Sequence, residues 1–543
     1  MKMRKDVLYL ILGWTLIALT VPLFLCGLAT IWLDSLEVAL YSFAIPCLIS
    51  PILGIILLSF TRTNTSERLR DKEAFAAVAL VWPLAVLIGA LPYWFGGVFI
   101  GPFADNVQFI DIARGAVNSW FESMSGFTTT GATVISPAMS PNCIPGSTID
   151  CINAQPKGLL IWRSLTQWLG GMGIIMLGMM ILSRIIGGGM ALARAELTGP
   201  SLSKIKPKLQ QTAIALWSLY IALTIIEFIL LKLVGGMTMF DSLNHALTTV
   251  ASGGFSTHDA SIGYFDSIAV ESIIVIFMFL AGVNFTLIWL ICMKEFKQVY
   301  GDEEFRSYLV YLGMGIGAMV IALISTDMAL GNSFRYSIFN VISIGTSTGY
   351  ASTNYIVWPM VTKILFLILM IVGACAGSTS GGLKLLRINL AFKVAMRELV
   401  KIAHPRRIQR IRMNGEVVER QQLGIIVGML FVWIGLFAIS CILLAIFMEN
   451  DSFESIISVV ASCLGNTGPA LGDYGPSETW AGMNSITLLI TSVLMWFGRL
   501  ELLTAVILLH PSTWAKEEKE QADRTAIALF KRLLPSNKEQ KKS

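Results

Sequence analysis

Four short strips rich in threonine, serine and glycine interrupt a chain that is otherwise hydrophobic enough for a membrane. They are strip 1 (TTTGAT, 128–133), strip 2 (ASGGFST, 251–257), strip 3 (TSTGYAS, 346–352) and strip 4 (GNTGPALG, 465–472). A membrane tolerates backbone outside a helix only where protein buries it or where it lines a watery path. A single strip of this kind is typical of a helix-capping turn. Four together favour a fold in which the strips meet along one path.

The composition predicts an all-α integral membrane protein. Of the 543 residues, 55% are hydrophobic and 14% are charged, and the mean hydropathy is +0.70. A helical span needs roughly 20 apolar residues. Ten such spans are predicted, at 7–33, 38–60, 74–100, 158–186, 211–235, 267–293, 308–326, 361–396, 422–448 and 482–510.

Basic residues fall in every second connection between these spans. The clusters lie at 62–72, 184–208, 294–306, 384–412 and in the tail. Because Lys and Arg concentrate on the cytoplasmic side, both termini are expected in the cytoplasm. The expected location of the chain is a bacterial inner membrane. The net charge of +5 is accounted for by these flanking residues, so no nucleic-acid partner is predicted. Membrane lipid is an expected contact.

The chain past the first two spans is predicted to contain four units with one pattern: an apolar span, a half-length segment, a strip and a second span. The half-length segments lie at 112–127, 240–250, 335–345 and 452–463, and they are too short to cross a bilayer. The predicted division is a two-helix unit at 1–72, repeats at 73–209, 210–306, 307–420 and 421–510, and a cytoplasmic tail at 511–543.

Motifs in all four units resemble one family. They are SMSGFTTTGAT (123–133), HALTTVASGGFST (245–257), GTSTGYAS with GACAGSTSGGLKLLRI (345–352 and 373–388), and GNTGPALG with WFGRLELLT (465–472 and 496–504). Together they are similar to the membrane subunit of Trk/Ktr/HKT potassium uptake systems, specifically the TrkH branch. The resemblance covers essentially the whole chain. It implies four membrane-pore-membrane repeats around one central pore plus two extra N-terminal helices, and a homodimer.

A potassium filter replaces the ion's hydration shell with backbone carbonyls, and glycine allows the positive φ that aims such carbonyls inward. Aligning the strips on their glycines matches Gly131, Gly254, Gly349 and Gly468, preceded by Thr130, Gly253, Thr348 and Thr467. These residues are the predicted potassium ligands. In strip 2 the glycine is doubled, so a shift of one residue, which would bring Ser252 into the ring, stays open.

A second small-residue stretch, here called the break segment (GACAGSTSGG, 373–382), interrupts the span at 361–396 below the predicted filter. The resemblance implies that this segment is an intramembrane gate, made by Gly373, Gly377, Ser378, Thr379, Ser380, Gly381 and Gly382. Packing of small residues between helices is the alternative. Arg499 lies near the middle of the last predicted span, where an arginine normally faces a cavity or partner. The resemblance implies that Arg499 contributes to gating. The alternative is that its side chain snorkels to the membrane surface or forms a structural pair with a residue of another unit.

The inward segments at 404–419 and 514–534 are charged and partly amphipathic. Anchoring at the membrane surface is one reading of them. The resemblance adds a cytoplasmic nucleotide-binding regulatory subunit, similar to TrkA, that docks there. No cofactor is expected on this chain itself, and potassium is its expected substrate.

Two rival functions would also account for part of this pattern. A secondary symporter coupled to sodium or protons would also use broken helices near mid-membrane. An enzyme with Thr or Ser nucleophiles would need a nearby base, which the strips lack. Cys143 and Cys151 share one outward loop and either form a disulfide or stay reduced. Glu227 lies within a span near Lys232, and an ion pair is expected, with a coupling-ion site as the alternative.

Overall fold

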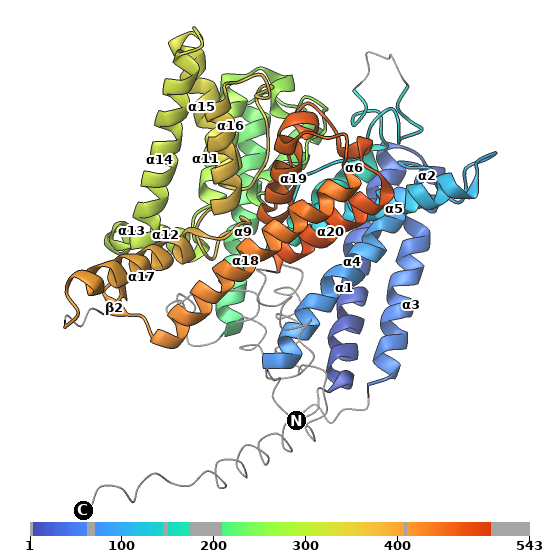
Figure 1. Cartoon of the computed structure of the whole chain (residues 1–543). Helices are drawn as coiled ribbons and strands as arrows, with labels where there is room; N and C mark the ends of the chain where they lie inside the picture. The colour runs from blue at the N-terminus through green and yellow to red at the C-terminus, as the bar shows by residue number, and fades with distance from the viewer. Residues whose placement is uncertain (1–3, 62–70, 145–149, 173–208, 407–409, 501–543) are drawn as a thin grey trace, which may run out of the picture.

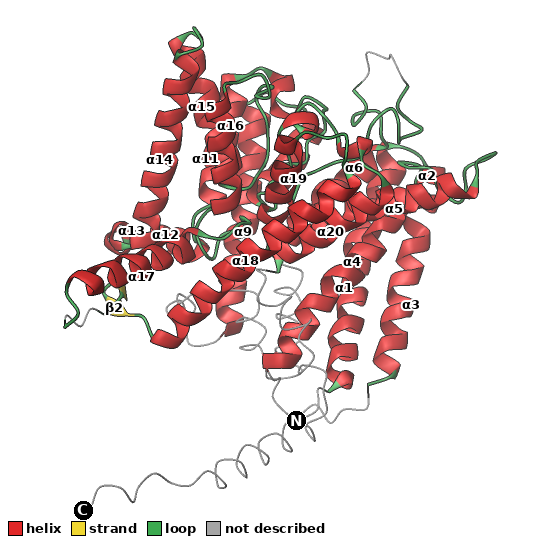
Figure 2. Cartoon of the chain, viewed as in Figure 1, coloured by secondary structure: helices red, strands yellow, loops and turns green. Residues whose placement is uncertain are grey.

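The computed structural model describes residues 4–61, 71–144, 150–172, 209–406 and 410–500. The described chain is a bundle of helices, with one short antiparallel strand pair, β1 (Arg412–Met413) and β2 (Glu416–Val417) (Figure 2). The basic clusters at 184–208 and in the tail at 511–543 lie outside the described residues. The helices in chain order are α1 (Lys5–Leu33), α2 (Leu36–Ala39), α3 (Ile45–Ser59), α4 (Asp71–Phe95), α5 (Phe109–Phe127), α6 (Lys157–Gly171), α9 (Leu209–Leu233), α10 (Met239–Val250), α11 (Ile268–Ala281), α12 (Phe285–Cys292), α13 (Phe296–Gly301), α14 (Glu303–Ile324), α15 (Leu330–Gly345), α16 (Met360–Val372), α17 (Leu385–Ala403), α18 (Arg420–Phe447), α19 (Phe453–Gly465) and α20 (Ser485–Arg499).

Helix starts follow local capping chemistry. The side chains of Thr238, Asp302, Ser452 and Asn484 each accept a hydrogen bond from a backbone N–H in the first turn of α10, α14, α19 and α20. Such caps satisfy donors that the helix itself leaves unpaired. The half-length segments predicted from the sequence correspond to α5, α10, α15 and α19.

Six helical stretches in the described part of the chain are long and apolar enough to cross a membrane, and they match six of the ten predicted spans. One of them is Leu36–Ser59, in which a π-helical turn at Leu40–Ala44 joins α2 to α3. The span predicted at 361–396 is broken as expected, because α16 ends at Val372 and α17 begins at Leu385. The apolar stretch predicted as a span at 267–293 is helical but broken, which the sequence did not predict. Helices α11 and α12 meet there at an angle of 107°. The predicted spans at 158–186 and 482–510 are described only as far as residues 172 and 500.

Eight helices pack in a closed circle. Each contacts the next in the order α5, α6, α10, α11, α15, α16, α19, α20, and α20 contacts α5 again. Helices α4, α9, α14 and α18 pack outside this circle, each against the short helix that follows it in the chain. This arrangement brings the ends of α5, α10, α15 and α19 together, and all four strips begin at those ends. Figure 1 shows the helical bundle that surrounds them.

The N-terminal helices lie at one side of the circle. Helix α1 packs against α3, α4 and α6. A Cβ on Gly13 would lie 2.8 Å from the carbonyl oxygen of Gly54, and a Cβ on Gly54 would lie 2.8 Å from the carbonyl oxygen of Gly13. Glycine at both positions therefore lets α1 and α3 approach closely, as small residues do between membrane helices.

Candidate functional site

The four short helices end in the same turn. In each, an N–H beyond the helix end bonds to a carbonyl five residues earlier, at 2.9 to 3.0 Å. The donor lies three residues past the end of α5, α10 and α15 and two residues past the end of α19. The residue before that N–H is left-handed in all four cases: Thr129 (φ 53°), Ser252 (φ 54°), Ser347 (φ 55°) and Asn466 (φ 49°). This is the hydrogen-bond pattern of a Schellman motif, which usually has glycine at the left-handed position. The shared turn gives the four strips one backbone path.

A glycine with positive φ follows two residues later in every strip: Gly131 (88°), Gly254 (75°), Gly349 (82°) and Gly468 (100°). A Cβ on each would overlap the carbonyl oxygen of the neighbouring strip. Gly131 faces Gly253, Gly254 faces Thr348, Gly349 faces Thr467 and Gly468 faces Thr130. The sequence of contacts returns to its start, so the strips form a closed ring. Only glycine fits at these four positions, for reasons of both φ and space.

The predicted filter residues are therefore brought together around this ring. The residues at the corresponding positions are Thr130, Gly253, Thr348 and Thr467, each directly before a positive-φ glycine. Ser252 lies one position earlier, at the left-handed turn equivalent to Ser347. Its side chain contacts the break segment, with its Oγ 2.9 Å from Thr379 Oγ1.

Gln167 of α6 is a residue of this site that sequence reasoning missed. Its Nε2 donates to the carbonyl oxygen of Gly253 at 2.5 Å, and its Oε1 accepts from the N–H of Phe255 at 3.1 Å. A Cβ on Gly253 would overlap the amide of Gln167, although the φ of Gly253 is not positive. The amide side chain therefore occupies the space that a threonine fills in the other three strips, and this explains the doubled glycine.

A buried ion pair supports the outer part of strips 1 and 2. Arg163 Nε lies 2.7 Å from Glu122 Oε1, and the two side chains are 3% and 0% exposed. Glu122 also accepts from the N–H of Val134 at 3.1 Å, while Arg163 donates to the carbonyl of Ser256 at 3.0 Å. Because each charge has its partner and further hydrogen bonds, the pair is satisfied within the protein. It ties α5 and α6 to both strips.

The break segment folds back on itself. Its ends are joined by hydrogen bonds from Leu383 N to Ile371 O (3.1 Å) and from Lys384 N to Val372 O (3.0 Å). The side chains of Ser378 and Ser380 lie 2.8 Å apart. Positive φ occurs at Gly373 (70°), Gly377 (75°) and Gly382 (83°). The turns at these glycines allow a compact loop between α16 and α17.

This loop lies against the ends of the short helices. Thr379 Oγ1 donates to the carbonyl of Val250 at 3.1 Å, and Gly381 N donates to Ser347 Oγ at 2.6 Å. A Cβ on Gly381 would overlap the carbonyl of Gly465. The break segment thus contacts the ends of α10, α15 and α19.

The unpredicted break between α11 and α12 receives the same loop. Cys375 N donates to Gly282 O at 3.1 Å, and Phe285 N donates to Gly377 O at 3.0 Å. Asn284 starts α12 as its N-cap, with its Oδ1 accepting from Thr286 N at 2.8 Å. Gly282 and Asn284 inside an apolar run were the sequence signal for this break.

Glu304, at the start of α14, is a second residue that sequence reasoning missed. Its Oε1 accepts hydrogen bonds from Ala376 N at 2.6 Å and from Leu386 N at 3.1 Å. The carboxyl group is buried. It joins the break segment to the first turn of α17, where a negative charge is favoured by the helix dipole.

Arg499 is the last residue of α20. Its Nη1 donates to the carbonyl of Thr379 at 2.9 Å, and its Nη2 donates to the carbonyls of Gly170 and Gly171 at 2.6 and 2.9 Å. The guanidinium fork therefore connects the break segment to the end of α6. Three acceptors on two elements suit arginine better than lysine, whose donors come from one nitrogen.

Cys143 and Cys151 are joined in a disulfide, the first of the two states expected from the sequence. The N–H groups of Cys151 and Ile152 donate to the carboxylate of Asp259 at 2.8 and 2.9 Å. The disulfide loop is thereby attached to the segment that follows strip 2.

His258 lies in this outer cluster, outside the membrane-spanning helices. Its Nδ1 is 2.7 Å from Asp150 Oδ2 and its Nε2 is 3.6 Å from Asp241 Oδ1, and its ring stacks on Tyr264 at 3.6 Å. Burial alone would lower the pKa of His258, but the two carboxylates outweigh it and raise the pKa to about 8.

The ion pair expected between Glu227 and Lys232 is wrong. Lys232 Nζ instead donates to the carbonyl of Met237 at 3.2 Å. Both carboxyl oxygens of Glu227 are buried without a hydrogen-bond partner among the described residues. This carbonyl lies in the short connection between α9 and α10.

Apolar helices that surround a closed ring of four non-helical strips are typical of an integral membrane transport protein. The family model described as TrkH, cation transport protein, matches residues 54–516. The chain therefore belongs to the TrkH family of cation transport proteins, as the motifs predicted, and it is a transporter rather than an enzyme.

Individual relatives agree with this assignment. The Trk system potassium uptake protein TrkH of Salmonella typhimurium is 35% identical over 471 residues, covering 85% of this chain and 90% of that protein. The Trk system potassium uptake protein TrkG of Escherichia coli is 31% identical over 461 residues, covering 84% and 88%. The crystal structure of the potassium transporter TrkH from Vibrio parahaemolyticus matches with a TM-score of 0.79 at 29% identity, covering 94% of this chain and 100% of that one.

Proposed function

We propose that this protein takes up potassium through a selectivity filter made by the four strips. The observation that carries the proposal is the closed ring of glycine–carbonyl contacts from Gly131 through Gly254 and Gly349 to Gly468. The relatives named as potassium uptake proteins support potassium as the substrate.

In this proposal the ion exchanges its hydration shell for carbonyl oxygens of Thr130, Gly253, Thr348 and Thr467 and of the glycines that follow them. The helices α5, α10, α15 and α19 end at these strips. The C-terminal end of a helix carries roughly half a negative charge, so four such ends favour a cation at their centre. The strips differ in sequence, so we expect fewer equivalent carbonyl layers than in a channel with four identical loops.

We assign gating to the break segment and Arg499. The support is that the segment contacts the ends of three short helices and that Arg499 holds it to α6 through the Thr379 carbonyl. Opening then requires that these hydrogen bonds exchange for others. The positive charge of Arg499 adds a barrier to cations while it stays beneath the ring.

The wider arrangement is also proposed. The chain has four repeats at 73–209, 210–306, 307–420 and 421–510 after a two-helix unit. It forms a homodimer in a bacterial inner membrane, with its basic connections and both termini in the cytoplasm. A cytoplasmic nucleotide-binding subunit similar to TrkA controls the gate from that side. The circular packing of the helices supports the repeats, and the distribution of Lys and Arg supports the orientation.

Replacing Gly349 with alanine tests the filter. The new Cβ would overlap the carbonyl of Thr467, and alanine disfavours the φ of 82°. The matched control is Gly236→Ala, which has a φ of 70° but no atom within 4 Å of the new Cβ. In proteoliposomes we expect potassium flux or its selectivity over sodium to fall at least tenfold for Gly349→Ala alone.

Equal behaviour of the two variants would refute the filter assignment. The same proteoliposomes separate uptake through a filter from coupled symport. Potassium accumulation against its gradient that depends on a sodium or proton gradient would favour the symporter.

A further inference from the structure

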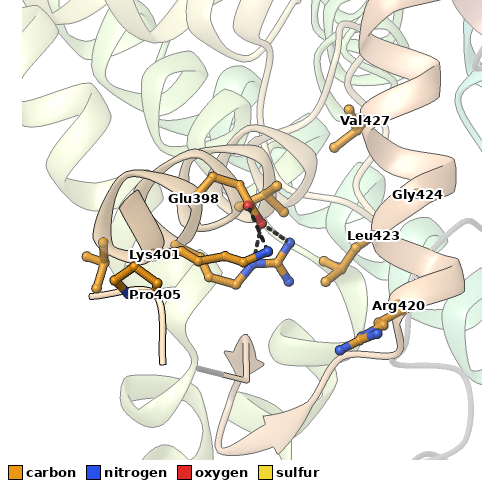
Figure 3. Close-up of a pocket in the computed structure, with 10 residues that line it drawn as sticks. Glu398, Lys401, Pro405, Arg420, Leu423, Gly424 and Val427 are labelled. Carbon is orange, nitrogen blue, oxygen red and sulfur yellow. Dashed lines mark hydrogen bonds and ion pairs between the residues drawn. The ribbon is translucent and has the colours of Figure 1, made fainter. Parts of the chain in front are cut away.

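A cavity of about 570 Å³ lies between α17 and the first turns of α18. One part of its lining is basic, with Arg397 and Lys401 on α17 and Arg420 on α18. Another part is apolar and includes Leu423 and Val427. Arg397 and Lys401 both form ion pairs with Glu398. Figure 3 shows Glu398 and Lys401 on one side of the cavity and Arg420 across it on the other helix. A site with this lining suits a molecule that is anionic at one end and apolar at the other.

Among the described residues that line the cavity, basic side chains outnumber acidic ones. Arg397 lies 2.7 Å and Lys401 3.8 Å from the same carboxylate of Glu398. No carboxylate in the described part of the chain forms an ion pair with Arg420. Three cationic side chains and one anionic side chain leave a net charge of +2 around the cavity. Such a site attracts an anion that offers several acceptor oxygens, as a phosphate does.

The cavity lies at the boundary of a membrane-spanning helix. Arg420 is the first residue of α18, a 28-residue apolar helix with only 17% of its most apolar window buried inside the protein. Leu423 and Val427 follow within the first turns of this span. The basic end of the cavity is therefore at headgroup level, and its apolar wall continues along a helix that faces acyl chains.

Helix α17 has the form of a helix that lies in a membrane surface. It runs across the direction of α14 and α16 (Figure 1). Four large apolar side chains at helical spacing are exposed on it: Phe392 (65%), Met396 (45%), Leu399 (60%) and Ile402 (78%). Lys393, Arg397 and Lys401 recur every four residues along another face. An exposed apolar stripe beside a basic stripe is typical of interfacial helices.

We propose that the cavity between α17 and α18 binds one anionic phospholipid. Arg397, Lys401 and Arg420 hold its phosphate, and an acyl chain lies along Leu423 and Val427. A soluble phosphate would leave the apolar wall without a partner, and a zwitterionic lipid would not match the net charge. Anionic headgroups are known to occupy basic pockets between membrane helices.

Lipid in this position also bears on the break segment, because α17 begins directly after it. That consequence rests on the proposed function, whereas the binding itself does not. If variants of the strips showed that the filter proposal is wrong, the lipid site would still stand. If the lipid did not bind, the filter proposal would still stand.

The test uses the full-length protein, purified and delipidated in detergent, and titrated with phosphatidylglycerol or phosphatidylcholine. Native mass spectrometry counts bound lipid, and the thermal midpoint reports stabilisation. The pocket variant combines Arg397→Gln, Lys401→Gln and Arg420→Gln. The matched control combines Lys294→Gln, Lys297→Gln and Arg306→Gln, which removes the same charge from exposed positions in the nearby α12–α14 region.

We expect one tightly bound phosphatidylglycerol in the unmodified protein, and an apparent affinity at least tenfold weaker in the pocket variant. The control should stay within twofold of the unmodified protein. Val427→Phe fills the cavity without changing charge and should weaken binding similarly, which covers the case in which the triple variant does not fold.

Four results would each overturn the proposal. They are equal stabilisation by phosphatidylcholine, equal stabilisation by inorganic phosphate alone, equal losses in the pocket and control variants, and loss of a dimer in the pocket variant without loss of lipid. The last would identify a second copy of the chain as the occupant.

Discussion

Gln167 offers the sharpest test of how the ring in strip 2 is held. It is fully buried and makes two hydrogen bonds to strip 2, at 2.5 Å to the Gly253 carbonyl and 3.1 Å from the Phe255 amide. Gln167→Met keeps the length of the side chain and removes both bonds. At about 1 kcal/mol for each bond the loss is about 2 kcal/mol, before any further cost of the stranded groups. This energy corresponds to about 30-fold in an equilibrium constant.

The assay is potassium and sodium flux in proteoliposomes. If the proposed filter is correct, Gln167→Met should reduce potassium selectivity by roughly tenfold or more, since strip 2 loses the group that holds its carbonyl. Gln155→Met is the matched control. Gln155 is also buried and hydrogen-bonded through both ends of its amide, but it lies beside the outer disulfide, where it donates to the carbonyl of Cys151. It should lower stability and leave selectivity unchanged.

A double substitution tests directly whether the amide of Gln167 is what excludes a side chain at Gly253. Gly253→Thr alone should abolish transport, because the new side chain would overlap the Gln167 amide. Combined with Gln167→Ala, the threonine gains the space it has in the other strips, and its backbone φ is permitted. Partial recovery of selective flux in the double variant is expected. Unchanged selectivity in Gln167→Met, or no recovery in the double variant, would refute this account.

Two further predictions concern the lower and outer parts of the site. Arg499→Ala removes the hydrogen bonds to the break segment, including that to the Thr379 carbonyl, and should raise basal cation flux about tenfold, since a charged hydrogen bond contributes about 1.5 to 3 kcal/mol. Arg499→Lys should give a basal cation flux between that of the unmodified protein and that of Arg499→Ala. Unchanged flux in both variants would exclude the gating role. The pKa of His258, raised from 6.5 to about 8 by Asp150 and Asp241, means that its stabilisation is complete below pH 6.5 and lost as the pH rises through about 8. The thermal midpoint should therefore drop across that window, and a His258→Gln variant that shows the same drop would contradict the assignment.

Much of the fold could be predicted from the sequence because its signals are local. Long apolar runs predicted six of the spans as continuous helices, and glycine and serine predicted the break after Val372. The break after Ala281 was missed, because Gly282 and Asn284 lie in a run whose hydropathy suffices for a span. The loop that stabilises this break comes from residues far along the chain. Phe285 bonds to Gly377, and hydropathy carries no information about such a partner.

The candidate site divides in the same way. Thr130, Thr348 and Thr467 could be aligned from the strips, since each directly precedes a glycine in the sequence. In the structure each of these glycines has a positive φ. Gln167 could not be found, because it is 86 residues from the glycine that it contacts. Glu304 is likewise 72 residues from Ala376. A polar residue in a membrane helix indicates that a partner exists, but only packing identifies the partner.

Strip 2 separates the two kinds of information most clearly. The requirement for glycine at Gly254 follows from the residue itself, because a positive φ is a property of the local backbone. The requirement at Gly253 does not, since its φ suits any residue. There glycine is needed because folding brings the amide of Gln167 into the space of a Cβ. The sequence can indicate a positive φ, because φ depends on the residue and its neighbours in the chain. The overlap that excludes a side chain at Gly253 arises only when a distant helix packs against the strip.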